Sequence, residues 1–193
     1  MGSSYTSNAI VFLVQTLFGL YIGAVMLRFL LGLVRADFYN PISQFLIKIT
    51  NPPIVPLRRI IPSVVGIDLA TVLLMVVLQA VEYMLMAAIR GFGIHPLSLV
   101  ILSIGGLLSL LLQIYFYTIL IQVILSWVAP GGHNPAISLL YSINEPVLRR
   151  ARRILPPIHG LDLSPLLVMI VLQLITILVI APINDFGAGL ASG

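Results

Sequence analysis

A few polar side chains lie within the long apolar segments of this sequence, and they could carry chemistry. Glu82 and Gln79 are one helical turn apart in the second segment, and Arg28 lies in the first. Gln122 and Gln173 lie in the third and fourth segments. Such groups are costly inside a membrane, and they mark ion or proton paths or hydrogen bonds between helices. The residue types allow both interpretations and favour buried polar packing. Arg28 and Glu82 should differ in depth by about 11 Å, which disfavours a direct bond between them.

Two aspartates precede apolar segments in the same local sequence, Gly-x-Asp-Leu. They are Asp68 and Asp162. An aspartate just before an apolar helix is a common N-cap, because its carboxylate accepts free backbone N–H groups. We predict that both carboxylates cap helices and pair with nearby arginines. The alternative is a cation site formed by the two carboxylates together.

Six arginines form two basic clusters, each between two long apolar segments. They are Arg58, Arg59, Arg149, Arg150, Arg152 and Arg153. Each basic side chain near an anionic membrane surface is attracted by about 1 kcal/mol. The six are therefore candidate lipid-binding or partner-binding residues. The alternative is that they only set the topology and hold the loops against the membrane.

Several other kinds of site have no support in the sequence. The chain has no cysteine, which excludes a disulfide, a thiolate nucleophile and a cysteine-based metal site. Its three histidines, His95, His133 and His159, lack the spacing of metal-binding motifs. We expect no cofactor and no enzymatic activity.

The composition indicates which secondary-structure elements position these residues. The chain has 193 residues, of which 60% are hydrophobic and 8% are charged, whereas soluble domains carry roughly 25% charged residues. A transmembrane helix needs about 20 consecutive apolar residues. We therefore predict an all-α membrane protein with four transmembrane helices, at about residues 9–34, 69–89, 100–128 and 163–183.

An internal repeat with an offset of 94 residues divides the chain into two parts, residues 1–96 and 97–193, within one membrane domain. The matching pairs include Asn40-Pro41 with Asn134-Pro135, Arg58-Arg59 with Arg152-Arg153, and Asp68-Leu69 with Asp162-Leu163. Each part contains a span, a loop and a second span. Two spans per repeat give both repeats the same orientation in the membrane.

The loops are predicted to contain two short amphipathic interfacial helices each. In the second loop Val147, Leu148 and Ala151 share one face and the arginines occupy the other, as is typical of helices at a membrane surface. Eight of the ten Lys and Arg residues lie in the two loops. The positive-inside rule therefore places both loops in the cytoplasm and both termini outside.

The sequence contains the segments DFYNPISQFLIKITNPPIVPLRRIIP, LSWVAPGGHNP and EPVLRRARRILPPIHGLDLSP. With the duplicated span–loop–span plan, these closely resemble the YggT family, which includes YlmG. The resemblance covers about residues 8–185 and implies a multi-pass protein of the bacterial inner membrane. Members are linked to osmotic-stress tolerance, potassium uptake, cell division and envelope organisation, and chloroplast relatives to haem attachment. No catalytic chemistry is established for the family.

These observations together favour a non-enzymatic membrane adaptor or assembly protein with a basic cytoplasmic platform, acting in envelope organisation or osmotic-stress response. The expected partners are anionic phospholipid of the inner leaflet and an unidentified membrane or cytoplasmic protein, with a second copy of the chain as a further candidate. Direct nucleic-acid binding is not expected. The alternative is a small ion channel or transporter, for potassium or another osmotic response, with Gln79 and Glu82 along its path.

Overall fold

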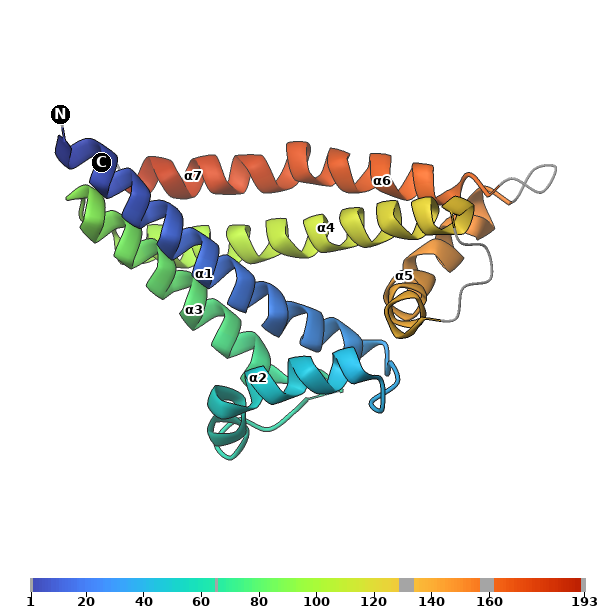
Figure 1. Ribbon diagram of the computed structural model, residues 1–193. Helices are drawn as coiled ribbons and strands as arrows, with labels where there is room; N and C mark the ends of the chain where they lie inside the picture. Colours follow the sequence, from blue (N-terminus) through green and yellow to red (C-terminus); the bar gives the residue numbers. More distant parts are fainter. Residues whose placement is uncertain (1, 65, 129–133, 157–161, 192–193) are drawn as a thin grey trace.

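The computed structural model describes residues 2–64, 66–128, 134–156 and 162–191, and the regular elements in these ranges are helices (Figure 1). They are α1 (Gly2–Leu33), α2 (Pro41–Arg58), α3 (Leu69–Arg90), α4 (Pro96–Val128), α5 (Pro135–Ile154), α6 (Ser164–Ile175), the π-helical turn η1 (Thr176–Ile180) and α7 (Ala181–Ala191). The last three follow one another without a break and form one long helix.

Four of these helices are long and apolar enough to cross a membrane. The qualifying segments are Tyr5–Leu33, Leu69–Arg90, Pro96–Val128 and Ser164–Leu190. The predicted all-α fold with four spans is thus confirmed, and the chain is a multi-pass membrane protein. The first and last helices extend beyond the predicted spans, because small and polar residues continue the helix past the apolar run that marks it in the sequence.

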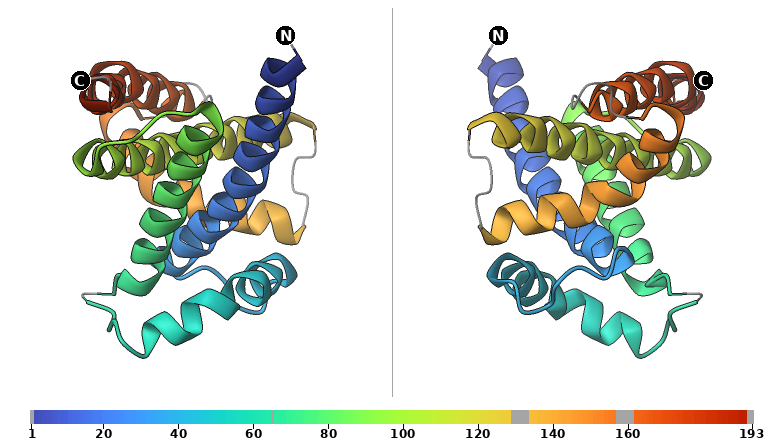
Figure 2. Two further views of the ribbon diagram at one scale, coloured as in Figure 1. Left: turned by 90° about the vertical axis from the view of Figure 1, so that its left-hand side faces the viewer. Right: turned by 90° about the vertical axis from the view of Figure 1, so that its right-hand side faces the viewer.

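The two repeats have the same orientation, as predicted. In Figure 1, α1 and α4 run from the left-hand end of the molecule toward the right, and α3 and the α6–α7 helix return. Consequently α1 begins and α7 ends at one end of the molecule, while α2 and α5 lie at the other (Figures 1 and 2). We call the end that carries α2 and α5 the loop end.

The loop helices differ from the prediction in one respect, because each loop folds into a single helix instead of two short ones. α2 continues through Pro52, Pro53 and Pro56, and α5 continues through Pro146. Proline removes one backbone hydrogen bond and crowds the preceding turn, which bends a helix when the neighbouring bonds persist. Both helices are bent (Figure 2). The two segments predicted in each loop are therefore the two arms of one bent helix.

Close contacts around α4 depend on its two adjacent glycines. A Cβ atom on Gly105 would collide with the side chain of Asn184 in α7, and one on Gly106 would lie 2.6 Å from the hydroxyl of Tyr83 in α3. The Ser98 hydroxyl donates a hydrogen bond of 2.6 Å to the carbonyl of Gly187. Small residues allow membrane helices to approach closely without a hydrophobic driving force. α4 is thereby fixed against both α3 and α7.

A small hydrophobic cluster joins the two repeats at the loop end. Leu31 of α1 and Leu46 of α2 pack with Leu139 and Ile143 of α5, and all four side chains are buried. The Asn40 side chain adds a hydrogen bond of 2.8 Å from its Nδ2 to the carbonyl of Pro135. The two loop helices are thus parts of one packed structure.

Candidate functional site

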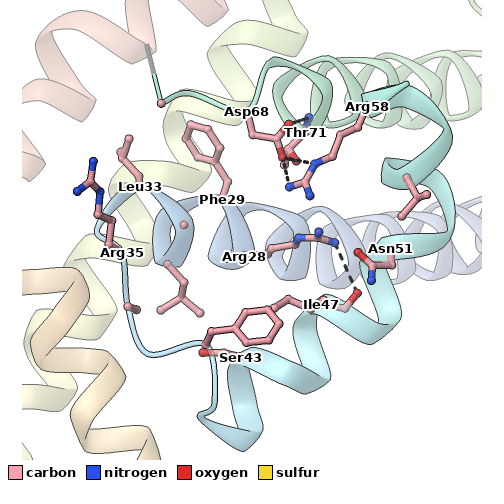
Figure 3. A pocket seen from close by; sticks show the side chains of 16 residues that line it. Arg28, Phe29, Leu33, Arg35, Ser43, Ile47, Asn51, Arg58, Asp68 and Thr71 are labelled. Carbon is pink, nitrogen blue, oxygen red and sulfur yellow. Dashed lines mark hydrogen bonds and ion pairs between the residues drawn. The ribbon is translucent and has the colours of Figure 1, made fainter. Parts of the chain in front are cut away.

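An ion pair connects the end of α2 to the beginning of α3. The Arg58 guanidinium donates to Asp68 Oδ2 through Nε at 3.0 Å and through Nη2 at 2.5 Å (Figure 3). Asp68 is also the N-cap of α3, because its carboxylate accepts hydrogen bonds from the backbone N–H and the hydroxyl of Thr71. One carboxylate therefore caps the span and attaches the loop helix to it.

The second repeat has the same ion pair at the equivalent positions. Arg152 Nε donates to Asp162 Oδ2 at 2.9 Å, and Arg152 Nη1 donates to Glu145 Oε2 at 3.0 Å. Asp162 Oδ1 accepts the backbone N–H of Ser164 at 3.0 Å, although the N-cap position of α6 is Leu163. Asp68 is itself the N-cap residue of α3, whereas Asp162 lies one residue before the N-cap residue of α6.

The two aspartates do not form one cation site. Each is bound by its own arginine, and the starts of α3 and α6 are well separated (Figures 1 and 2). Within the described ranges, no three His, Cys, Asp or Glu side chains are grouped so that they could hold a metal ion. His133 and His159 lie outside those ranges. His95 accepts the backbone N–H of Leu97 at the start of α4.

Both aspartates are held in the charged form by their partners. Burial alone would raise the pKa of Asp68, but hydrogen bonds from Arg58 and Thr71 outweigh this effect and lower it. The pKa of Asp162 is lowered in the same way, since hydrogen bonds from Arg152 and Ser164 exceed the desolvation effect. Both ion pairs are therefore intact at neutral pH.

In each repeat, a polar contact at equivalent positions attaches the first span to the loop helix. In the first repeat, Arg28 Nη1 donates to Thr50 Oγ1 at 2.7 Å and to the carbonyl of Ile47 at 3.5 Å. In the second, Asn144 Nδ2 donates to Gln122 Oε1 at 2.8 Å. The offset of 94 residues maps Arg28 onto Gln122 and Thr50 onto Asn144. Thr50 and Asn144 were not predicted as contact residues, although both are polar residues at equivalent positions on the apolar faces of the two loop helices.

The remaining intramembrane polar residues behave differently in the two repeats. Gln79 Nε2 donates to Glu82 Oε2 at 2.8 Å, and both side chains are buried. Gln173 is equivalent to Gln79, but its side chain is exposed on α6 and makes no hydrogen bond to the described residues. Arg28 bonds to α2 and not to Glu82. Gln79, Glu82 and Gln122 are thus buried, whereas Gln173 is exposed on the single chain.

Comparison with known proteins identifies the repeats independently. The sequence model of the CCB3/YggT family matches twice, at residues 7–89 and 101–183. The two matched ranges are displaced by 94 residues at both ends, which is the offset of the internal repeat. The chain belongs to the CCB3/YggT family. The contacts Arg58–Asp68 and Arg28–Thr50 lie in the first matched range, and Arg152–Asp162 and Gln122–Asn144 lie in the second.

Relatives in this family are similar over most of the chain. An uncharacterized protein of Pseudomonas aeruginosa is 47% identical over 176 residues, which are 90% of this chain and 89% of the relative. YggT of Escherichia coli K12 is 37% identical over 171 residues, 87% of each chain. The protein ycf19 of Guillardia theta is 40% identical over 65 residues, 33% of this chain and 71% of the relative. No solved structure matches the chain.

The six loop arginines of this family member fall into two groups. Arg58 and Arg152 are bound to Asp68 and Asp162. The other four have exposed side chains, and they are Arg59, Arg149, Arg150 and Arg153. Only one of those four has a carboxylate partner in the described ranges, a long contact of 3.5 Å from Arg149 to Glu145. All of them belong to or adjoin α2 and α5, so the exposed positive charge gathers at the loop end.

Proposed function

We propose that the protein is a non-enzymatic membrane adaptor or assembly protein whose loop end contacts anionic phospholipid and a protein partner. The observation that carries this proposal is the division of the arginines. Arg58 and Arg152 are paired with the aspartates that precede α3 and α6, while Arg59, Arg149, Arg150 and Arg153 are exposed and make no such pair. Exposed cations next to an apolar span are attracted to anionic headgroups and to acidic protein surfaces.

The attachment of the loop helices supports this role. α2 is connected to α1 by Arg28 and Thr50 and to α3 by Arg58 and Asp68. It is also packed against α5 by the hydrophobic cluster that joins the repeats. Helices held at several points present their outer faces in one fixed arrangement, which reduces the entropy lost on binding. The loop end therefore has the properties of a preformed docking surface.

The proposed location is the bacterial inner membrane, with the loop end in the cytoplasm and both termini outside. The charge distribution supports this orientation, since Arg90 is the sole Lys or Arg outside the two loops and α1. The cytoplasmic leaflet carries anionic lipid that complements the exposed arginines. Envelope organisation or osmotic-stress response is the process in which we place the adaptor.

The test is in-membrane crosslinking of the native chain beside a variant in which Arg59, Arg149, Arg150 and Arg153 are changed to glutamine. A discrete protein partner should be captured with the native chain and lost with the variant. The matched control is Arg90→Gln, an exposed arginine at the opposite end of α3, which should leave capture unchanged. Identical captured proteins from all three chains would contradict the proposal.

Topology must be measured in the same experiment, because removing four positive charges can reorient a membrane protein. The chain has no cysteine, so a single cysteine placed at the loop end can be labelled with a membrane-impermeant reagent without background. Loss of the partner counts as support when the labelling pattern of the variant equals that of the native chain.

A second candidate function is a small ion channel or transporter, and the buried carboxyl group of Glu82 favours it. Glu82 is 7% exposed and bonded to Gln79 within α3, and ionisable groups inside membranes often mark ion or proton paths. Ion flux into liposomes should be abolished by Glu82→Gln if this function holds. An adaptor without transport activity would give the same background flux with the native chain and the variant.

A further inference from the structure

We propose that the cavity between α1, α2 and the start of α3 binds the phosphate group of one anionic phospholipid. The cavity has a volume of about 650 Å³ and lies in the first repeat (Figure 3). Its polar lining includes Arg28, Arg35, Ser43, Asn51, Arg58 and Asp68. This inference deepens the proposed lipid contact of the loop end by assigning it a defined site.

The charges that line the cavity favour an anion. Three arginines face a single carboxylate, Asp68, which leaves two positive charges without an acidic partner in the lining. The guanidinium groups of Arg28 and Arg58 are turned toward the same space (Figure 3), and they lie within electrostatic range of each other. An anion between them would relieve this repulsion.

Several donors in the cavity remain available. Arg58 contacts Asp68 through Nε and Nη2, and Arg28 contacts Thr50 and Ile47 through Nη1. The other N–H groups of both guanidiniums have no protein acceptor among the described residues. Guanidinium groups present parallel N–H donors that match the oxygens of a phosphate. The two arginines therefore offer a pair of donor edges to one ligand.

Ser43 provides an independent sign of a missing ligand. Its side chain lines the cavity and is only 5% exposed, yet its Oγ has no hydrogen-bond partner in the described part of the chain. A buried hydroxyl is normally hydrogen-bonded, and leaving it unpaired is costly. A phosphate oxygen in the cavity would be an acceptor for this hydroxyl.

The apolar part of the lining indicates that the phosphate belongs to an amphiphile. Phe29, Leu33, Ile47 and Val55 line the same cavity as the arginines, and α1 is the transmembrane helix from which two of them come. Free inorganic phosphate would gain nothing from these side chains. A phospholipid could place its headgroup between the arginines and its acyl chains along the apolar side of α1.

The second repeat lacks the same charge arrangement. Gln122 stands at the position equivalent to Arg28, and Ala129 at the position equivalent to Arg35, while Arg152 and Asp162 balance each other. Ala129 is outside the described residues, so this part of the comparison rests on sequence. The expected stoichiometry is accordingly one anionic lipid per chain.

The test is native mass spectrometry of the full chain with added phosphatidylglycerol, phosphatidylcholine or inorganic phosphate. One phosphatidylglycerol per chain should remain bound, in preference to phosphatidylcholine, and excess inorganic phosphate should not displace it. The double variant Arg28→Gln with Arg35→Ala gives the first repeat the residues of the second, and its affinity for phosphatidylglycerol should fall about tenfold or more. The control, Arg90→Gln, removes an exposed positive charge at the opposite end of α3 and should retain the lipid.

Three results would overturn the inference. They are unchanged lipid retention by the double variant, equal retention of phosphatidylcholine, and binding of inorganic phosphate that competes fully with lipid. Circular dichroism and a monodisperse elution profile verify that the double variant is folded. If it does not fold, the variant Arg28→Lys with Arg35→Lys is used in its place. This variant keeps both charges and should retain the lipid. The double variant keeps all four exposed arginines, so partner capture by the loop end should survive in it even when lipid is lost.

Discussion

The two repeats use the same framework but place different side chains on it. The ion pair from loop helix to second span, Arg58–Asp68, has its equivalent in Arg152–Asp162. The contact from first span to loop helix, Arg28–Thr50, has a neutral equivalent in Gln122–Asn144. The contacts that both repeats share hold the helices together. The positive charges of Arg28 and Arg35, which the second repeat lacks, distinguish the cavity of the first repeat.

The second spans show the same contrast. In α3, Glu82 bonds with Gln79 inside the molecule. In the α6–α7 helix the equivalent residues are Thr176, which bonds back to the carbonyl of Leu172, and the exposed Gln173. The π-helical turn begins at Thr176, and such turns change the direction in which following side chains point. The second repeat therefore has no equivalent of the buried carboxyl group.

The largest expected effect comes from the neutral contact of the second repeat. Asn144 is fully buried and bonded to both Gln122 and Thr118. Asn144→Leu should lower the free energy of unfolding by about 2–3 kcal/mol, because the buried Gln122 and the partly buried Thr118 lose their bonds to it. Thr50→Val should cost only about 1 kcal/mol, since Arg28 keeps the Ile47 carbonyl within reach. Unfolding by SDS titration in mixed micelles measures both, and equal effects would contradict the comparison.

The two ion pairs should also contribute unequally to the free energy of unfolding. Asp68→Ala removes the N-cap of α3 together with the partner of Arg58 and should cost about 2 kcal/mol. Asp162→Ala should cost about 1 kcal/mol, because Asp162 is not the N-cap residue and its side chain is 32% exposed against 20% for Asp68. Thermal unfolding followed by circular dichroism compares them, and a larger loss at Asp162 would reverse the ranking.

Substitutions of the equivalent residues Gln79 and Gln173 should differ less in their effect on the free energy of unfolding. Gln79→Leu leaves Glu82 buried without its hydrogen-bond donor and should cost about 1 kcal/mol. Gln173→Leu should be neutral or slightly stabilising in micelles, because it replaces an exposed amide without a described partner by an apolar side chain in an apolar span. The same SDS titration tests both variants. Destabilisation by Gln173→Leu would mean that this amide has a partner, such as a second copy of the chain.

The smallest expected effect is the loss of stability when acid protonates the aspartates of the two ion pairs, Asp68 and Asp162. The pKa of Asp68 and that of Asp162 are below the usual aspartate value in the folded chain. Their stabilising contribution is therefore present above the unfolded pKa, near 3.9, and is lost as pH falls from there through the lowered folded values. Unfolding measured between pH 6 and pH 2 should show this decline, and Asp68→Asn combined with Asp162→Asn should reduce it. An unchanged decline in the double variant would assign the acid sensitivity to other groups.

Much of the fold could be predicted from particular residues. The length of the apolar runs predicted the four spans, and the matching Asn-Pro, Arg-Arg and Asp-Leu pairs predicted the repeat. The depth argument correctly disfavoured a bond between Arg28 and Glu82. The short distance along the sequence from Asp68 to Arg58 and Arg59 was the basis for predicting that this carboxylate pairs with an arginine.

Other features depend on information that local sequence does not contain. Two short helices were predicted in each loop, but α2 continues through Pro52 and α5 continues through Pro146. Apolar periodicity could not assign a face to Gln173, since every side of a membrane helix is apolar. The cavity was missed because Arg35 and Ser43 come together with Arg28 only through the packing of α2 on α1.

The hydrogen bond from Asn40 to Pro135 has a consequence for the history of the chain. Asn40 caps α2 with its Oδ1 and uses its Nδ2 to reach the first residue of α5, so one repeat makes a contact that the other receives. The ycf19 protein of Guillardia theta is about as long as one repeat, because its 65 matched residues are 71% of it. Duplication of such a unit accounts for the offset of 94 residues, and the Asn40–Pro135 bond joins the two copies in one direction only.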